Sequence, residues 1–185
     1  MKRLSIFFIV LVFVLSFSRN VTAQNAGTGL SATSGARFIN VSYELPYPGI
    51  LPDNPLYFLK VLRDNALNFF ITDSVKKANY DLLMADKRLA SSASLLDKGN
   101  YQLAITTLSK SGNYFDQAIQ LAAQSKTQGK DATIILDKLW TSSQKHQLVI
   151  YQMSQKAKGE VKYNLELLQV RAKSFQDTVE VVRSQ

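Results

Sequence analysis

The chain has 185 residues, of which 46% are hydrophobic, with no cysteine and a formal net charge of +8 at pH 7. The lack of cysteine excludes a disulfide framework, a thiolate metal site and a cysteine nucleophile, so a packed core must supply the stability. The lysines are spread along the chain and no nucleic-acid-binding motif is present, so nucleic acid is not an expected partner.

The N-terminus predicts the compartment. Two basic residues precede an apolar run over 4–17, LSIFFIVLVFVLSF, and a polar segment then ends in VTA at 21–23. This pattern predicts a secretory signal peptide over 1–23, cleaved near Ala23, and a periplasmic or cell-surface location. The alternative is an uncleaved membrane anchor, although the run is shorter than the roughly 20 residues of a spanning helix. Cleavage would leave 19 basic and 14 acidic residues, a net charge of +5.

The next two segments differ in stiffness. Residues 24–42 are rich in Gly, Ser, Thr and Ala without a period, which predicts a flexible tether. Residues 43–60 read YELPYPGILPDNPLYFLK, and their four prolines fix φ and favour extended neighbours. We expect a rigid strap that leads into a helix, with Asn54 as N-cap and Pro55 as first helical residue.

The strap also holds the candidate binding residues. Its rings sit on a backbone that proline has already stiffened, so ordering them costs less chain entropy than in a flexible loop. One hypothesis is that the rings pack across helix ends and close the core. The other is that Tyr47 and Tyr57 face outward as anchors for a partner. The candidate partner-binding residues are Tyr43, Tyr47, Leu51, Tyr57 and Phe58.

Helix signals repeat after the last proline. Apolar residues recur at spacings of three and four, separated by Thr72-Asp73-Ser74, Lys98-Gly99 and the region of Gly129. Whether a fourth helix from Asp131 continues through Gly159 into a fifth is left open by an apolar pattern that runs across it. In the first helix, 55–70, the stripe consists of Leu56, Leu59, Leu62, Ala66 and Phe69.

Narrow stripes on long helices are typical of antiparallel packing. The predicted fold is therefore all-α: an antiparallel bundle of about four to five helices, preceded by the extended strap. The predicted domain organisation is a signal peptide (1–23), a tether (24–42) and one strap-plus-bundle domain (43–185).

Three segments carry a resemblance to a known family. They are YELPYPGILPDNPLYFLKVLRD, then KKANYDLLMADKRLASSASLLDKGNYQLAITTL, then KHQLVIYQM, over about residues 43–155. This order resembles the secreted or membrane-tethered bacterial helical domains catalogued as domain of unknown function, family 5667. Their shared leader is close to LPYPGxLPDSPLYxLK, with Asn54 here where serine is common. The resemblance implies a helical fold and a bacterial envelope or extracellular setting, and it implies no reaction.

Candidate chemical groups are few. His146 is the single histidine, and it lies on an apolar stripe. We interpret it as a core or boundary residue with one hydrogen-bond partner, the alternatives being a metal ligand or a pH-sensitive hinge. The carboxylates recur near lysines and predict ordinary exposed helix charges; they include Asp81, Asp86, Asp97, Asp116 and Asp137. We therefore expect no catalytic residue, no metal, no cofactor and no enzymatic activity.

These features together predict a non-catalytic extracytoplasmic helical module that binds a protein or polymer partner in the bacterial cell envelope. The alternative is a membrane-associated helical protein, held by an uncleaved N-terminal segment or by an amphipathic face with positive charge near anionic lipid.

Overall fold

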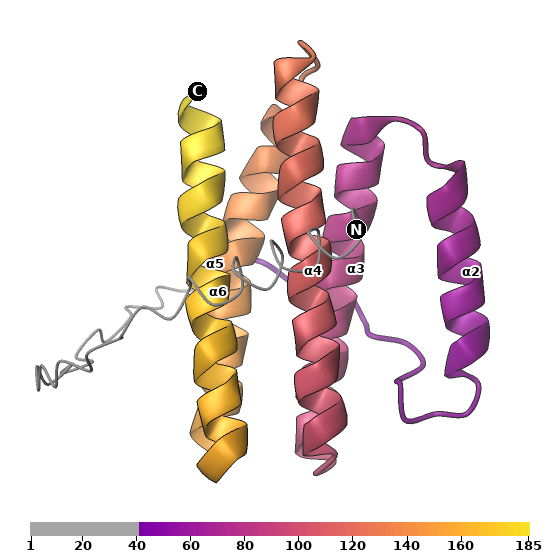
Figure 1. Ribbon diagram of the computed structural model, residues 1–185, viewed down its shortest axis with the longest axis vertical. Coiled ribbons are helices and arrows are strands. Elements are labelled where there is room, and N and C mark those ends of the chain that lie inside the picture. The colour runs from indigo at the N-terminus through magenta and orange to yellow at the C-terminus, as the bar shows by residue number, and fades with distance from the viewer. Residues whose placement is uncertain (1–40) are drawn as a thin grey trace, which may run out of the picture. The chain divides into compact units, whose positions relative to one another are not determined.

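The computed structural model describes residues 41–185, so the predicted signal peptide and nearly all of the predicted tether lie outside the described residues. The described part of the chain is helical, without strands, which confirms the all-α fold (Figure 1). Its helices are α2 (Tyr57–Phe70), α3 (Ser74–Asp97), α4 (Tyr101–Thr127), α5 (Thr133–Lys156) and α6 (Gly159–Ser184).

Helices α3 to α6 form the antiparallel bundle that the sequence predicts. Helix α3 packs most extensively on α4, and α5 on α6; contacts of α4 with α6 and of α3 with α5 join the two pairs. Short connections between successive helices make them antiparallel neighbours. Helix α2 stands beside α3, apart from this four-helix group (Figure 1).

The bundle's turns follow the predicted signals. Asp73 is the N-cap of α3, where its Oδ1 accepts the N–H of Lys76 at 2.9 Å. Gly99 and Gly129 follow α3 and α4 with φ of 79° and 73°, the left-handed region that glycine enters without a steric penalty. The backbone of Ala157 and Lys158 is extended, so α5 and α6 are separate helices.

Two helices begin later than the sequence predicts. Helix α2 starts at Tyr57, because the Asn54 side chain accepts the N–H of Leu56 at 2.8 Å and closes a turn that precedes the helix. Helix α5 starts at Thr133, whose N–H is bound by the Asp131 side chain at 3.0 Å. Asn and Asp side chains of this kind stabilise a turn in competition with the helix.

The core lies between the four bundle helices. Phe115 of α4 is fully buried; its ring stacks on Phe175 of α6 with centroids 4.7 Å apart and meets the His146 ring of α5 edge-on at 4.8 Å. The three rings thus join three helices. Other fully buried apolar side chains are Ala78, Ala85, Leu89, Leu95, Ala104, Ala118, Ala122, Leu139, Leu165 and Val179.

Buried serines bring α3 and α4 together. The Ser92 hydroxyl donates to the carbonyl of Ala104 at 2.8 Å, and the Ser111 hydroxyl donates to the carbonyl of Ala85 at 2.7 Å. Small side chains allow the two backbones to approach closely enough for these bonds, which satisfy the buried hydroxyls. This explains how a serine-rich segment of α3 fits in a helix interface.

Candidate functional site

Helix α2 presents its apolar side to solvent. The predicted core stripe is exposed, reaching 66% at Leu62 and 83% at Phe69. Prediction of a packed stripe was wrong because the opposite, mostly polar side of α2 faces the bundle: Tyr57, Lys60, Val61, Asp64 and Asn68 are half-buried or buried. The exposed stripe, hereafter the α2 apolar face, consists of Phe58, Leu59, Leu62, Ala66, Phe69 and Phe70.

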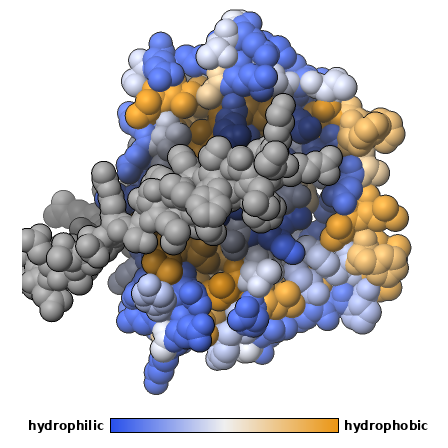
Figure 2. Space-filling model, viewed as in Figure 1, coloured by the Kyte–Doolittle hydropathy of each residue, from blue (hydrophilic) through white to orange (hydrophobic). Residues whose placement is uncertain are grey.

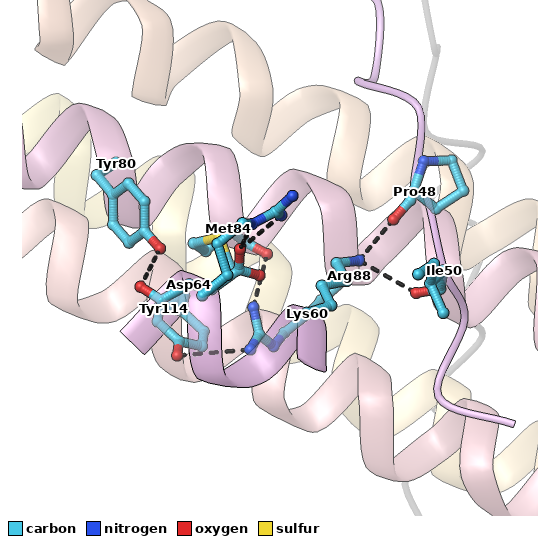
Figure 3. Close-up of polar contacts among 9 residues, drawn as sticks. Pro48, Ile50, Lys60, Asp64, Tyr80, Met84, Arg88 and Tyr114 are labelled. Carbon is cyan, nitrogen blue, oxygen red and sulfur yellow. Dashed lines mark hydrogen bonds and ion pairs between the residues drawn. The ribbon is translucent and has the colours of Figure 1, made fainter. Parts of the chain in front are cut away.

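Polar bonds hold α2 in this orientation. The Tyr80 hydroxyl of α3 donates to the carbonyl of Asp64 at 2.7 Å (Figure 3). The Lys60 ammonium donates to the strap carbonyls of Pro48 and Ile50 at 2.6 and 3.3 Å. These bonds use the polar side of α2, which leaves the hydrophobic side chains to form the orange surface on the α2 side of Figure 2.

A groove of about 470 Å³ lies between the strap and α2. All the charged residues that line it are basic, namely Lys60, Arg63 and Lys87, and no carboxylate lines it. Burial lowers the pKa of Lys60, and the positive charges of Lys87, Arg88 and Arg63 act in the same direction while Asp64 opposes them. The groove, hereafter the strap–α2 groove, is therefore a site of positive potential beside an apolar surface.

The predicted binding residues divide into two groups. Tyr47 and Phe58 are exposed, at 84% and 63%, and Tyr47 lines the strap–α2 groove. Tyr43, Leu51 and Tyr57 are half-buried, and Lys60 lies 5.6 Å from the centroid of the Tyr57 ring. The two hypotheses for the strap thus each describe some of its rings: Tyr47 faces outward, whereas Tyr43 packs on the bundle.

A buried carboxylate fixes Tyr43. Asp86 of α3 accepts hydrogen bonds from the Tyr43 hydroxyl at 2.5 Å, the Ser142 hydroxyl at 2.7 Å and His146 Nε2 at 2.9 Å. Burial, and next the negative charge of Asp86, raise the pKa of Tyr43. His146 is 1% exposed, which agrees with a core histidine bonded to one partner. Both Asp86 oxygens are occupied, so this cluster ties the strap to α3 and α5.

Asp81 is a second buried carboxylate, and its surroundings differ. Its Oδ1 has no hydrogen-bond partner in the described chain, and burial raises its pKa to about 6 although Lys77 acts against this. The expectation of exposed charges was wrong for Asp81 and Asp86, each 2% exposed. Both lie three or four residues from Ala78, Leu82, Ala85 or Leu89 in the core, a spacing that could have indicated their burial.

The described range, residues 41–185, lacks two other kinds of feature. No three His, Cys, Asp or Glu side chains in this range come together as a group able to hold a metal ion. None of the helices described in this range combines the length and apolar character needed to cross a bilayer.

No curated protein and no solved structure matches the chain. The family described as "Domain of unknown function (DUF5667)" matches residues 49–161, which begin within the strap and end in the first turn of α6. The match includes α2, the Asp86–His146 pair and the lining of the strap–α2 groove except Tyr47 and Pro48, and it spans more than half of the sequence. The chain belongs to this family of domains of unknown function.

Proposed function

We propose that the protein is a non-catalytic extracytoplasmic helical module that binds a component of the bacterial cell envelope through the α2 apolar face and the adjoining strap. The signal-like N-terminus supports the compartment, as does the envelope setting that the resemblance in the leader implies. Three of the buried polar residues stabilise the fold, which supports a non-catalytic role for them: Asp86 binds three donors, and the bonds of Ser92 and Ser111 join helices.

The orientation of α2 carries the proposal. A bundle that needed α2 for its core would bury the Leu and Phe side chains, as α3 to α6 do with most of theirs. Here five large apolar side chains on one helix face are each at least 49% exposed, while a part-buried hydrogen bond from the Tyr80 hydroxyl to the Asp64 carbonyl holds the helix in place. A contiguous apolar patch that hydrogen bonds keep exposed is typical of an interaction surface.

The test compares binding to washed envelope fragments. The chain is expressed with its own leader, purified in its processed form and weighed by mass spectrometry. The Leu62→Gln/Phe69→Gln double variant should stay in the supernatant when fragments are sedimented, whereas wild type should pellet. The matched control is Leu167→Gln/Val170→Gln, which removes two exposed apolar side chains of α6.

Equal sedimentation of wild type and the α2 variant would show that α2 is not the binding surface. A far-ultraviolet circular dichroism melt verifies that both variants fold, and we expect this because each substituted residue is exposed.

A further inference from the structure

We propose that the envelope component bound by the α2 apolar face is the surface of an anionic lipid bilayer, with phosphate headgroups in the strap–α2 groove. This inference rests on the proposed function, since it names the partner of the same surface. The argument joins two observations, an exposed apolar helix face and a cluster of positive charge on its border.

The α2 apolar face has the form of an interfacial helix. Its 14 residues span about 21 Å, and the apolar arc recurs at helical spacing from Phe58 to Phe70. Helices that lie in the plane of a membrane bury such a face about 5–10 Å into the boundary between headgroups and acyl chains. Leu62, Phe69 and Phe70 are the most exposed large side chains of the α2 apolar face. They would therefore be the first to enter the bilayer.

The positive charge lies where headgroups would be. Leu59 belongs both to the α2 apolar face and to the lining of the strap–α2 groove, so the groove borders the face directly. Arg63 lines the groove one helical turn after Leu59, and Lys87 of α3 also lines it. Asp64 pairs with Arg63 at 2.7 Å and offsets one charge, which leaves the groove with net positive charge.

The strap adds an interfacial aromatic. Tyr47 is 84% exposed and lines the same groove, with Ile50 beside it. Tyrosine is enriched at the headgroup level of membranes because its ring is apolar and its hydroxyl is polar. Apolar insertion combined with several cations provides the two signals that stable peripheral binding requires.

Charge favours lipid over a second copy of the chain. Two α2 apolar faces that met would bring two positively charged grooves together, and juxtaposed like charges oppose association. An anionic bilayer instead attracts each Lys or Arg near its surface, by a factor of about 5 in affinity per residue.

The experiment measures sedimentation of the purified, processed chain with vesicles. Wild type should bind anionic vesicles that contain phosphatidylglycerol and phosphatidylcholine. It should bind neutral vesicles of pure phosphatidylcholine at least about 10-fold more weakly, and its affinity for the anionic vesicles should fall as the salt concentration is raised. Leu62→Gln/Phe69→Gln should lose at least about 10-fold on the anionic vesicles. The Leu167→Gln/Val170→Gln control should bind as wild type does.

A second pair of variants tests the groove. Arg63→Gln/Lys87→Gln should weaken binding to anionic vesicles at least about 10-fold and flatten its salt dependence. The matched charge control is Lys158→Gln/Lys173→Gln, two exposed lysines near and in α6, which should change binding much less.

Several results would overturn the lipid inference. They are equal binding to neutral and anionic vesicles, equal effects of the groove and control charge variants, or no vesicle binding at all. If wild type pellets with envelope fragments through Leu62 and Phe69 but ignores vesicles, the proposed function stands and the partner is a protein or polymer. If the α2 variant instead converts a dimer into a monomer in analytical ultracentrifugation, the face binds a second copy.

Discussion

Asp81 and Asp86 lie five residues apart on α3 and are equally buried, yet their environments differ. Asp86 accepts three hydrogen bonds, so its buried carboxylate is stabilised by its neighbours. Asp81 has an oxygen without a partner, and its burial disfavours the charged form. At the scale of single residues, Asp86 therefore binds the strap to the bundle, whereas ionised Asp81 reduces stability.

The pH dependence of Asp81 follows from the raised pKa. Below its ordinary pKa of 3.8 the Asp81 carboxyl is protonated in both the folded and unfolded states, so its ionisation does not lower the free energy of unfolding. Between 3.8 and about 6 the unfolded state loses the proton while the folded state keeps it, so stability falls as pH rises. Above that range the full penalty, about 3 kcal/mol, remains.

We therefore expect Asp81→Asn to raise the free energy of unfolding at neutral pH by up to about 3 kcal/mol. The gain should disappear below pH 3.8, where Asp81 is neutral in both states. Urea unfolding of wild type and variant at both pH values measures this. The control is Asp97→Asn, at an exposed position of the same helix. If Asp81→Asn raised the free energy of unfolding equally at both pH values, ionised Asp81 would not be the cause of the lower stability.

At the scale of helices, an arginine and a glycine set the approach of α6 to α4. The Arg171 guanidinium of α6 lies over Gly112 and donates to Asn113 at 2.8 Å and Asp116 at 2.5 Å. A Cβ atom at Gly112 would lie 2.9 Å from Arg171 Nη1, too close for both groups to keep their places. The guanidinium thus occupies the space that a Cβ atom at Gly112 would need, in a helix interior where glycine is otherwise unfavourable.

A double-mutant cycle tests this contact. Gly112→Ala alone should change the free energy of unfolding by less than about 0.5 kcal/mol. The gain in helix propensity should offset the cost of displacing the Arg171 guanidinium from its hydrogen-bond partners. In an Arg171→Ala background the same substitution should stabilise by about 1 kcal/mol, since no guanidinium opposes it. Equal effects in the two backgrounds, measured by urea unfolding, would mean that Gly112 and Arg171 are not coupled.

At the scale of the whole described domain, burial rather than residue type decides which aromatic rings stabilise the fold. Phe115 is fully buried against Phe175 and His146, whereas Phe58 of α2 is 63% exposed. The contacts between helices are concentrated in α3 to α6, and the apolar face of α2 lies outside this core.

This division predicts effects of very different size for the same Phe→Ala substitution at two positions. Phe115→Ala should lower the free energy of unfolding by about 3–5 kcal/mol, because it removes a ring that three helices share. Phe58→Ala should cost less than about 0.5 kcal/mol. Urea denaturation followed by far-ultraviolet circular dichroism compares them, and a large loss for Phe58→Ala would show that α2 belongs to the cooperative core.

Local signals in the sequence determined much of the architecture. Asp73 as an N-cap, and Gly99 and Gly129 after helix ends, act through neighbouring backbone atoms, so their effects can be predicted without the fold. The three-and-four spacing likewise predicted the bundle helices, and the placement of His146 on an apolar stripe predicted its burial.

Only the tertiary structure decided which face of each helix is covered. Helical periodicity shows that α2 has an apolar side, but Tyr80 and the strap carbonyls that hold its polar side lie elsewhere in the chain. Asp86 likewise gained its donors from the strap and from α5, 43 and 56 or more residues away. A sequence pattern specifies a side chain's direction from its own helix, whereas burial depends on which distant segment arrives there.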